Sequence, residues 1–421
     1  MSLAHSIKGK AAWLEDDDLQ RLLAALSADG EEARVAGGAV RNALMGQEVA
    51  DIDIATTNLP DATIARAEAA GFRTVPTGKE HGTITVVAHH HPFEVTTLRD
   101  DVETDGRHAK VAFGRDWKRD AERRDFTFNA LYARADGTVI DLVGGLKDLE
   151  ERRVRFIGDA EARIREDYLR ILRFFRFFAT YGAGRPDAEG LKACAKLKGG
   201  MSRLSAERVW AEMRRLLGAR DPSRALLWMR TTGVLSTILP ETKKWGIDAI
   251  HPLVAAEDEL GWAPDPLLRL EAMVPPDPER LEAMAERLRL SKADGGRLVS
   301  WAKAPAIGPE TDERALAATL YRHAGQGIAD RLRLSLASAR GKAATETAEL
   351  HRAAGFSRLL RMAEKWERPQ LPIRGADLIA KGARQGPQLG TLLARLEDEW
   401  IDSGFALDRG ALMARAAELM A

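Results

Sequence analysis

The most constraining feature of this sequence is a change of periodicity part-way along the chain. Short runs of β-branched and apolar residues, separated by turn formers, occur between Ala33 and Leu142, whereas Ala, Leu and Arg recur at helical spacing from Asp159 to Ala421. A strand alternates its faces every two residues and a helix repeats after about 3.6, so the two patterns bury different side chains. The sequence therefore predicts a mixed α/β head followed by an all-helical remainder.

The length sets the number of cores. At 421 residues, the chain exceeds the roughly 250 to 300 residues at which one hydrophobic core stops growing. We expect a head over residues 1–150, a first helical segment over 151–220 and a helical remainder over 221–421.

The head should combine seven strands with two helices. Four leucines at helical spacing predict an amphipathic helix over Asp16 to Ser27, and a second helix is expected over 61–70. His89 to Pro92 is typical of a hairpin turn rather than a metal site, because adjacent histidines on an extended chain point to opposite sides. Asp100 to Lys118 is polar and unpatterned and predicts a mobile loop. Strands are predicted over residues 33–36, 52–55, 72–75, 83–88, 93–98, 127–134 and 138–142.

Composition restricts the class of protein. No run of about 18 apolar residues is present, so no membrane-spanning segment is expected. The N-terminal stretch is interrupted by charges and lacks the apolar core of a signal peptide. The single cysteine, Cys194, cannot form an internal disulfide. We therefore expect a cytoplasmic protein.

Charge is balanced overall but not locally. The formal net charge is +0, so the chain as a whole gives no signal for nucleic acid. Residues 185–230 contain eleven Lys or Arg against five Asp or Glu. Such an excess could contact phosphates, or could form an ordinary solvated helical surface.

Two aspartates carry the main chemical signal. Asp51 and Asp53 are two apart in an apolar run, so on an extended strand both carboxylates leave on the same side. Like charges held together are costly unless a cation lies between them, and hard oxygen ligands suit Mg²⁺. This pattern predicts a Mg²⁺ site for phosphoryl-type chemistry. Glu94, on another predicted strand, is a candidate third ligand, with an ordinary surface carboxylate as the equal alternative.

The residues upstream strengthen this interpretation. An isolated Asp-x-Asp is most often an exposed turn or an edge strand. Here, Gly37 and Gly38 form a predicted strand-to-helix turn, with Arg41 just inside the helix and Asp51 ten residues further on. Glycines let the backbone approach a phosphate, and a helix N-terminus presents free N–H groups to it. Arg41 could then reach a triphosphate, although a surface arginine is an alternative of similar weight.

A second segment, Arg123 to Ala130, places an Arg-Asp pair before an apolar run. Asp125 can accept hydrogen bonds from ribose hydroxyls while Arg124 donates. The alternative is a simple salt bridge between the two.

A third segment places Asp167, Arg170 and Arg173 at i, i+3 and i+6 of a predicted helix. A carboxylate acceptor and a guanidinium donor together could read the edge of a base. The alternative is an ordinary surface ion pair between Glu166 and Arg170.

Taken together, these segments resemble the ordered motifs of the bacterial CCA-adding tRNA nucleotidyltransferases and their poly(A) polymerase relatives, the class II nucleotidyltransferases. The resemblance covers residues 33–212 in most detail. Its motifs are GGAVRN at 37–42, DID at 51–53, RRDFTFNA at 123–130, EDYLRILR at 166–173 and SAERVWAE at 205–212.

The resemblance implies a polymerase-β-like nucleotidyltransferase head followed by helical neck, body and tail domains. It implies that Asp51 and Asp53 hold Mg²⁺, and that Asp167 and Arg170 act as a protein template that pairs with CTP or ATP. Glu207 and Arg208 would brace that helix. The other residues expected to bind the nucleotide are Gly37, Gly38 and Arg41 at the triphosphate, Arg124 and Asp125 at the ribose, and Asn129 and Arg173 beside them. One departure is Asn42, where many relatives have Asp, which we interpret as a position that supports the turn.

The predicted activity is the addition of C and A to the 3′ end of tRNA. One alternative is poly(A) polymerase, but Gly78 to Thr85 reads GKEHGTIT, which resembles the CCA-adding type. Enzymes that add only C or only A resemble this sequence closely, and the loop at 100–118 would govern that distinction. An alternative of another class is a non-catalytic RNA-binding protein, which loss of either metal carboxylate would have favoured.

Overall fold

The computed structural model describes residues 6–89, 91–101, 111–243, 245–323, 325–343 and 346–420. The chain divides into two compact units, one formed by Met1–Glu212 with Arg224–Ile238 and the other by Met213–Ser223 with Leu239–Ala421. The strands of the described residues all lie in the first unit, before Gly145, and regular structure beyond that point is helical. The predicted fold class, an α/β head followed by helices, is therefore confirmed.

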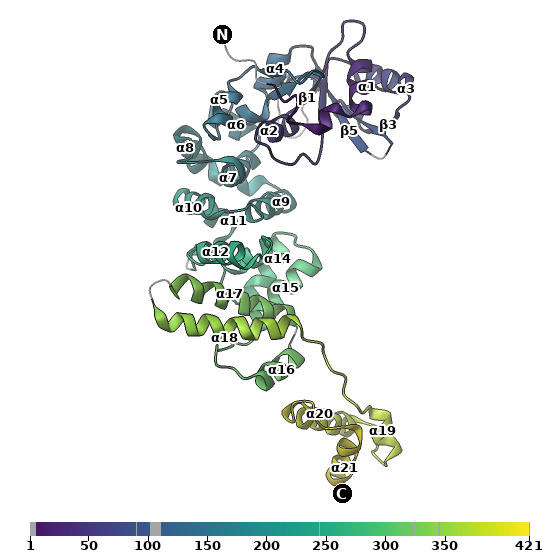
Figure 1. The fold of residues 1–421 in the computed structure, drawn as a ribbon, viewed down its shortest axis with the longest axis vertical. Coiled ribbons are helices and arrows are strands. Elements are labelled where there is room, and N and C mark those ends of the chain that lie inside the picture. Colours follow the sequence, from purple (N-terminus) through teal and green to yellow (C-terminus); the bar gives the residue numbers. More distant parts are fainter. Residues whose placement is uncertain are drawn as a thin grey trace. The chain divides into compact units, whose positions relative to one another are not determined.

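The first unit is built on a seven-stranded sheet of order β3-β4-β5-β2-β1-β8-β9. Its strands β1, β3 and β5 are labelled in Figure 1. β2 and β5 pair in parallel, and the other neighbours are antiparallel. Every residue of β1 is buried, as expected for a central strand that is covered on both faces. The strands are β1 (Ala33–Ala36), β2 (Asp53–Thr56), β3 (Arg73–Gly78), β4 (Thr83–Ala88), β5 (His91–Thr97), β8 (Leu131–Ala133) and β9 (Val139–Asp141).

Helix α1 (Asp17–Leu26) forms where the leucine spacing predicted it. The Asp16 side chain accepts a hydrogen bond from the Leu19 amide at 2.9 Å and so caps the helix. All four leucines are buried against α3 (Pro60–Ala69) and the sheet. The other helices of this unit are α2 (Gly38–Leu44), α4 (Trp117–Glu122), α5 (Gly145–Glu150), α6 (Ala160–Glu166), α7 (Leu169–Tyr181), α8 (Ala188–Leu197), α10 (Ser223–Thr232) and α11 (Val234–Ile238).

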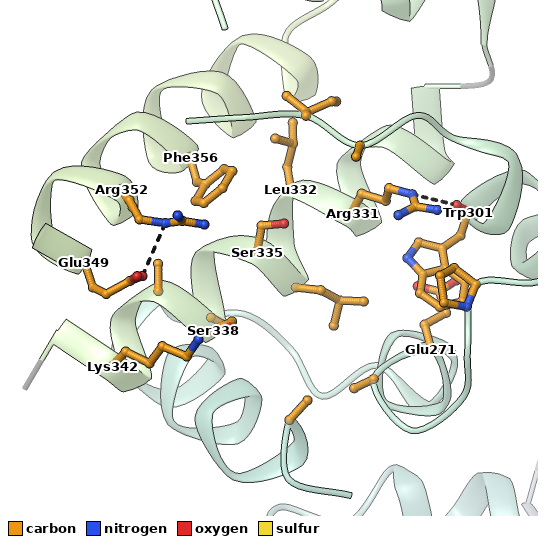
Figure 2. Close-up of a pocket in the computed structure, with 18 of the residues that line it drawn as sticks. Glu271, Trp301, Arg331, Leu332, Ser335, Ser338, Lys342, Glu349, Arg352 and Phe356 are labelled. Carbon is orange, nitrogen blue, oxygen red and sulfur yellow. Dashed lines mark hydrogen bonds and ion pairs between the residues drawn. The ribbon is translucent and has the colours of Figure 1, made fainter. Parts of the chain in front are cut away.

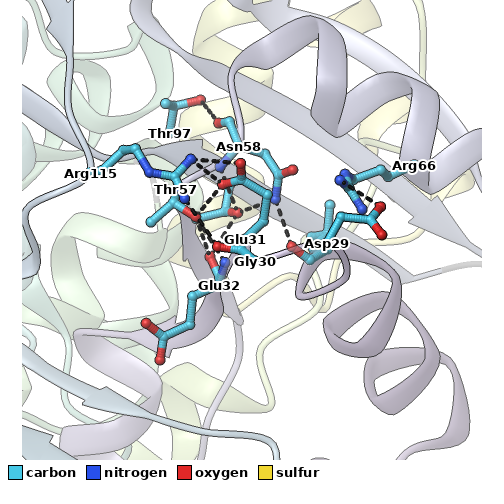
Figure 3. A network of polar contacts seen from close by, with 11 residues as sticks. Asp29, Gly30, Glu31, Glu32, Thr57, Asn58, Arg66, Thr97 and Arg115 are labelled. Atoms are coloured by element: carbon cyan, nitrogen blue, oxygen red, sulfur yellow. Dashed lines mark hydrogen bonds and ion pairs between the residues drawn. The ribbon is translucent and has the colours of Figure 1, made fainter.

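A polar network fixes the ends of the central strands (Figure 3). The Thr57 amide donates to the Glu32 carbonyl at 2.9 Å, and the Glu32 amide donates to the Thr57 hydroxyl at 2.8 Å. Arg115 donates to the Glu31 carboxylate at 2.6 Å. The hydrogen bonds from Arg115 and Thr57 lower the pKa of Glu31 by more than burial raises it. The Thr97 hydroxyl donates to the Asn58 carbonyl at 2.8 Å, which ties β5 to the end of β2.

Two predicted elements of the head are wrong in part. The strand expected over 127–134 begins only at Leu131, because Thr127 to Asn129 form a 3-10 turn. The Thr127 hydroxyl donates to the Asp148 carboxylate at 2.6 Å. The loop expected over Asp100 to Lys118 is structured at both ends. β6 (Arg99–Asp101) pairs with β7 (Val111–Phe113), and α4 begins at Trp117, while residues 102–110 lie outside the described residues.

Two boundaries also shift. β2 begins at Asp53, so Ile52 and Asp51 precede the strand in which the sequence placed them. β4 and β5 form the predicted hairpin, but β5 already includes Pro92 and begins at His91, and His90 lies outside the described residues.

The second unit consists of helices. Its described residues include a cluster of buried apolar side chains around Leu332 and Phe356 and another around Trp400 and Leu412. α9 (Ala206–Leu217) begins in the first unit and ends in the second. Within the described ranges, no helix has the length and apolarity needed to cross a membrane. The further helices are α12 (Ile250–Leu260), α13 (Pro266–Glu271), α14 (Pro278–Arg287), α15 (Lys292–Lys303), α16 (Glu313–Arg322), α17 (Gly325–Ala343), α18 (Thr347–Glu364), α19 (Gly375–Ala380), α20 (Pro387–Asp402) and α21 (Arg409–Met420).

A buried arginine in α13 closes the end of α9. Arg269 is fully buried and pairs with the Glu257 carboxylate at 2.6 Å. It also donates to the carbonyl oxygens of Leu217, Ala219 and Arg220, which lie at or just after the helix end. Those carbonyls have no partner within a helix, so the guanidinium satisfies groups that would otherwise be buried without hydrogen bonds.

Glu271, two residues further along the chain from Arg269, has the opposite environment. It lines a pocket of about 380 Å³ beside Trp301 and Arg331 (Figure 2), and both of its carboxyl oxygens are buried without a hydrogen-bond partner. The nearby cations are engaged elsewhere. Arg297 binds Asp330 at 2.8 Å and Asp265 at 2.6 Å, while Arg331 donates to backbone carbonyls. Burial and then the Asp330 charge raise the pKa of Glu271 well above its usual value.

This environment predicts a pH-dependent stability. Because the folded-state pKa of Glu271 lies above the unfolded value, stability falls as pH rises from the unfolded pKa toward the folded one. Glu271→Gln, which has no proton to lose, should therefore gain in melting temperature relative to the native chain as pH is raised from 5 to 8. Thermal melts across that range test this, with Glu282→Gln on the exposed face of α14 as the control. An offset that does not change with pH would contradict the raised pKa.

Candidate active site

The first unit contains a pocket of about 470 Å³ whose wall is formed by segments far apart in the sequence. The pocket contains Asp53 and all nine residues that the sequence predicted to bind a nucleotide. Six arginines and three aspartates line it, so its charge favours an anionic ligand. The lining residues are Gly37, Gly38, Arg41, Asp53, Arg124, Asp125, Asn129, Asp167, Leu169, Arg170, Arg173, Arg176, Phe177 and Arg208.

A glycine turn forms one side of the pocket. Gly37 precedes α2 with a φ of +68°, a conformation that glycine adopts without strain. A Cβ at Gly37 would lie 3.3 Å from both Arg124 Nη1 and the Asn129 carbonyl oxygen. Gly38 has no such constraint, because its nearest neighbour would be Arg41 Nη2 at 3.7 Å. The backbone of Gly37 therefore makes room for two other residues of the site.

Asp53 supplies one of the three aspartate carboxylates of the pocket. It lies in β2 directly beside Glu94 of β5, in the parallel register that brings these two residues together. The residue is exposed, but it lines the pocket and is partly desolvated there. This desolvation raises the pKa of Asp53 most, and the negative charges of Glu94 and Asp51 raise it further. The predicted placement of Glu94 next to the Asp-x-Asp segment is confirmed.

The three predicted metal ligands do not contribute equally. Asp53 lines the pocket, whereas Asp51 and Glu94 are exposed residues outside its lining. Among the described residues, no group of three His, Cys, Asp or Glu side chains is close enough to surround a metal ion. The mutual repulsion that raises the Asp53 pKa is nevertheless the condition that a divalent cation relieves.

Asp125 also lines the pocket and is buried. Its Oδ2 accepts from Arg173 Nε at 2.7 Å, and its Oδ1 accepts from Asn129 Nδ2 at 3.0 Å and from the Phe126 amide at 2.9 Å. Burial alone would raise the pKa of Asp125, but the charge of Arg173 and these hydrogen bonds lower it. Both oxygens are already engaged, so recognition of a ribose hydroxyl would have to share them.

Arg124 is held by an aspartate that the sequence analysis missed. Asp120 is buried in α4 and its Oδ2 lies 3.3 Å from Arg124 Nη2, while it also accepts from the Tyr132 hydroxyl at 2.7 Å and from Arg123. Burial raises and the two arginines lower the pKa of Asp120, with the net effect downward. The available signal was its i,i+4 spacing to Arg124.

The template segment differs from its prediction. Asp167 is not on the same helix as Arg170 and Arg173, because its extended backbone (φ −151°, ψ 107°) separates α6 from α7. All three side chains still line the pocket. Asp167 Oδ2 accepts from Arg208 Nη2 at 2.7 Å. Arg170 pairs with Glu166, so the ordinary ion pair weighed as an alternative is present together with the pocket position.

Known proteins with related sequences cover nearly the whole chain. "CCA tRNA nucleotidyltransferase 1, mitochondrial" of Danio rerio is 34% identical over 399 residues, which are 92% of this chain and 87% of that protein. The chain belongs to the family of CCA-adding enzymes and poly(A) polymerases. A "CCA-adding enzyme" of Limosilactobacillus fermentum is 30% identical over 96% of this chain and 98% of that protein. The identity and coverage of these relatives confirm the predicted family. The relatives come from both animals and bacteria, so the predicted bacterial branch is not confirmed.

Two segments match sequence profiles of this family. "Poly A polymerase head domain" matches residues 33–155, which include the glycine turn, β2 and Asp125. "Probable RNA and SrmB- binding site of polymerase A" matches residues 185–245, which include the basic stretch noted in the sequence.

Solved structures of the family have the same fold. The CCA-adding enzyme of Bacillus stearothermophilus in complex with CTP has a TM-score of 0.65 and 26% identity, covering 92% of this chain and 94% of that one. The Thermotoga maritima enzyme complexed with tRNA has a TM-score of 0.70 over the full length of both chains, and its 20% identity supports the fold alone.

The glycine turn provides a test of the pocket in this family member. Gly37→Ala should weaken nucleotide binding by about tenfold and lower stability by about 1 kcal/mol, because the new methyl group meets Arg124 and Asn129 in a strained backbone conformation. Gly38→Ala, one residue on, should change binding by less than about threefold because its Cβ meets only ordinary contacts. Calorimetric titration with CTP compares the two, and equal losses would contradict the assigned geometry.

Proposed function

We propose that this chain transfers C and A nucleotides from CTP and ATP to the 3′ end of tRNA. In this reaction, the terminal 3′-hydroxyl of the RNA attacks the α-phosphate and pyrophosphate leaves. The observation that carries the proposal is the assembly of one pocket that is lined by six arginines and by Asp53. A triphosphate needs cationic partners, and a metal-dependent transfer needs a carboxylate next to them.

We propose Mg²⁺ as the metal, held by Asp53 and Asp51 with Glu94 as the third carboxylate. The donor chemistry fits this ion because all three are hard oxygen ligands, and the repulsion acting on Asp53 favours a bound cation, toward which the side chains of Asp51 and Glu94 would have to turn. A bound Mg²⁺ would supply activation of the attacking hydroxyl and charge neutralisation of the leaving pyrophosphate. The limited number of protein carboxylates leaves positions for water and substrate phosphates, as Mg²⁺ prefers.

The residues of this chain would divide the work between the two ends of the nucleotide. Arg41 binds the triphosphate, and Arg124 and Asp125 orient the ribose. Asp167 and Arg170 read the base edge, for which they must exchange their present ion pairs with Arg208 and Glu166 for hydrogen bonds to the base. Those ion pairs hold the two side chains at the pocket wall before the nucleotide arrives.

The alternatives are narrower variants and one other class. A poly(A) polymerase or an enzyme that adds only C or only A would use the same pocket, and only the products distinguish them. A non-catalytic RNA-binding protein is disfavoured because Asp51 and Asp53 are both present. We also propose a cytoplasmic location and membership of the bacterial branch, which stay predictions from the sequence.

Incorporation assays test the activity. Incubation of the purified chain with tRNA lacking its 3′ end, Mg²⁺ and each triphosphate in turn, followed by sequencing of the products, should show addition of C and A. Asp53→Asn should lower the rate at least about a hundredfold, because the substitution removes a negative charge from the metal site. Asp61→Asn, on the exposed start of α3, is the matched control. Full activity of Asp53→Asn would remove its assigned role.

Base selection forms a separate prediction. Arg170→Ala should change the preference for CTP and ATP over UTP and GTP by about tenfold or more, since one good base contact contributes about 1 to 3 kcal/mol of discrimination. Arg165→Ala, which loses only an exposed ion pair with Glu161, should leave selection unchanged. Competition among the four triphosphates measures this, and an unchanged preference in Arg170→Ala would argue against the template role.

A further inference from the structure

Arg41 is a buried cation whose hydrogen-bond acceptors are side-chain amides. Its side chain is 7% exposed. Its Nη1 donates to Asn129 Oδ1 at 2.5 Å, and its Nε and Nη2 donate to Asn42 Oδ1 at 3.1 and 3.0 Å. Across the residues that the structure describes, no carboxylate forms an ion pair with it. Both partners are neutral amides, so they orient the guanidinium without cancelling its charge.

Aromatic rings complete the environment of this guanidinium. Its centre lies 4.2 Å from the Tyr181 ring, 5.4 Å from Phe177 and 5.9 Å from Phe128. These rings offer cation–π stabilisation, which attracts the guanidinium but supplies no negative charge to neutralise it. A buried charge is costly unless it is paired, and Arg41 lines the pocket. The arrangement is therefore completed by an anion, which the proposed function identifies as the triphosphate.

Asn42 joins three parts of the site through one side chain. Its Oδ1 accepts from Arg41 and also from the Tyr181 hydroxyl at 3.1 Å, while its Nδ2 donates to the Glu48 carbonyl oxygen at 2.8 Å. Tyr181 is the last residue of α7, the helix that carries the template arginine. Glu48 lies in the segment that leads from α2 to Asp51 and Asp53. The donors on one side and the carbonyl on the other fix the orientation of the amide.

We propose that Asn42 and Tyr181 are positioning residues that hold Arg41 in the direction of the triphosphate. This inference rests on the proposed function of the pocket. Neither residue belongs to the pocket lining, so they act through Arg41 and not on the nucleotide. Because Arg41 serves the phosphates and not the base, their removal affects CTP and ATP equally.

The test compares three variants of the full-length chain by equilibrium binding of CTP and CMP in the absence of tRNA. Asn42→Leu keeps the size of the side chain but removes the acceptor and also the donor to the Glu48 carbonyl oxygen, and should weaken CTP binding about tenfold while CMP binding stays within about twofold. Asn42→Asp loses the donor to the Glu48 carbonyl oxygen but keeps acceptors for Arg41 and Tyr181, and should restore CTP binding to within about threefold of the native chain. Tyr181→Phe removes only the hydroxyl and should weaken CTP binding about threefold.

Kinetics and a double variant extend the test. In incorporation assays, Asn42→Leu should raise the KM for CTP and for ATP by the same factor, with kcat within about twofold of the native value. Adding Tyr181→Phe to Asn42→Leu should cause no further loss, because both substitutions act on the same oxygen. Thermal melts of each variant separate a loss of fold from a loss of positioning.

Each result decides the proposal. Native-like CTP binding by Asn42→Leu, or an equal loss of CTP and CMP binding, would overturn it. If Asn42→Leu does not fold, native-like CTP binding by Tyr181→Phe would overturn it in the same way. Failure of the native chain to extend tRNA would contradict the proposed function instead, and the comparison of CTP with CMP would still test the positioning of Arg41.

Discussion

The site depends on one series of hydrogen bonds between side chains that begins and ends on the same helix. From Arg173 of α7 it passes to Asp125 at 2.7 Å, to Asn129 at 3.0 Å and to Arg41 at 2.5 Å. It then returns through Asn42 to Tyr181, at the end of α7. Removing one partner of a buried pair leaves the other charge uncompensated, at a cost of about 3 to 5 kcal/mol. This series of hydrogen bonds therefore fixes how α7 packs on the sheet and where the arginines of α7 point.

Within this frame, two aspartates of the pocket have opposite electrostatic situations. Arg173 and hydrogen bonds lower the pKa of Asp125, so its charge is already satisfied by the protein. Partial desolvation and the repulsion of Glu94 and Asp51 raise the pKa of Asp53, whose charge is not satisfied. Two carboxylates in one site whose pKa values are shifted in opposite directions commonly have different roles. Here, Asp125 organises the site, and Asp53 is the carboxylate to which a cation would bind.

The second unit shows the same contrast in a different setting. Arg269 and Glu257 form a buried ion pair, and the remaining N–H groups of Arg269 donate to backbone carbonyls at the end of α9. Glu271 is buried beside arginines that are already engaged, and its carboxyl oxygens have no partner. Its oxygens are sealed from solvent although the residue lines a pocket, which is why its expected signature is a pH-dependent stability and not the binding of a ligand.

The sequence by itself determined what depends on local order. Leucine spacing located α1, alternation located most strands, and the motifs identified most of the residues that line the pocket, because side-chain periodicity and chemical type are properties of short segments. Tertiary structure alone decided the rest. It set the break at Asp167, the pairing of Asp125 with Arg173, and the convergence of Arg41 and Tyr181 on Asn42. These features are set by partners far apart in the chain, and no local pattern specifies which distant side chain will satisfy a buried donor or charge.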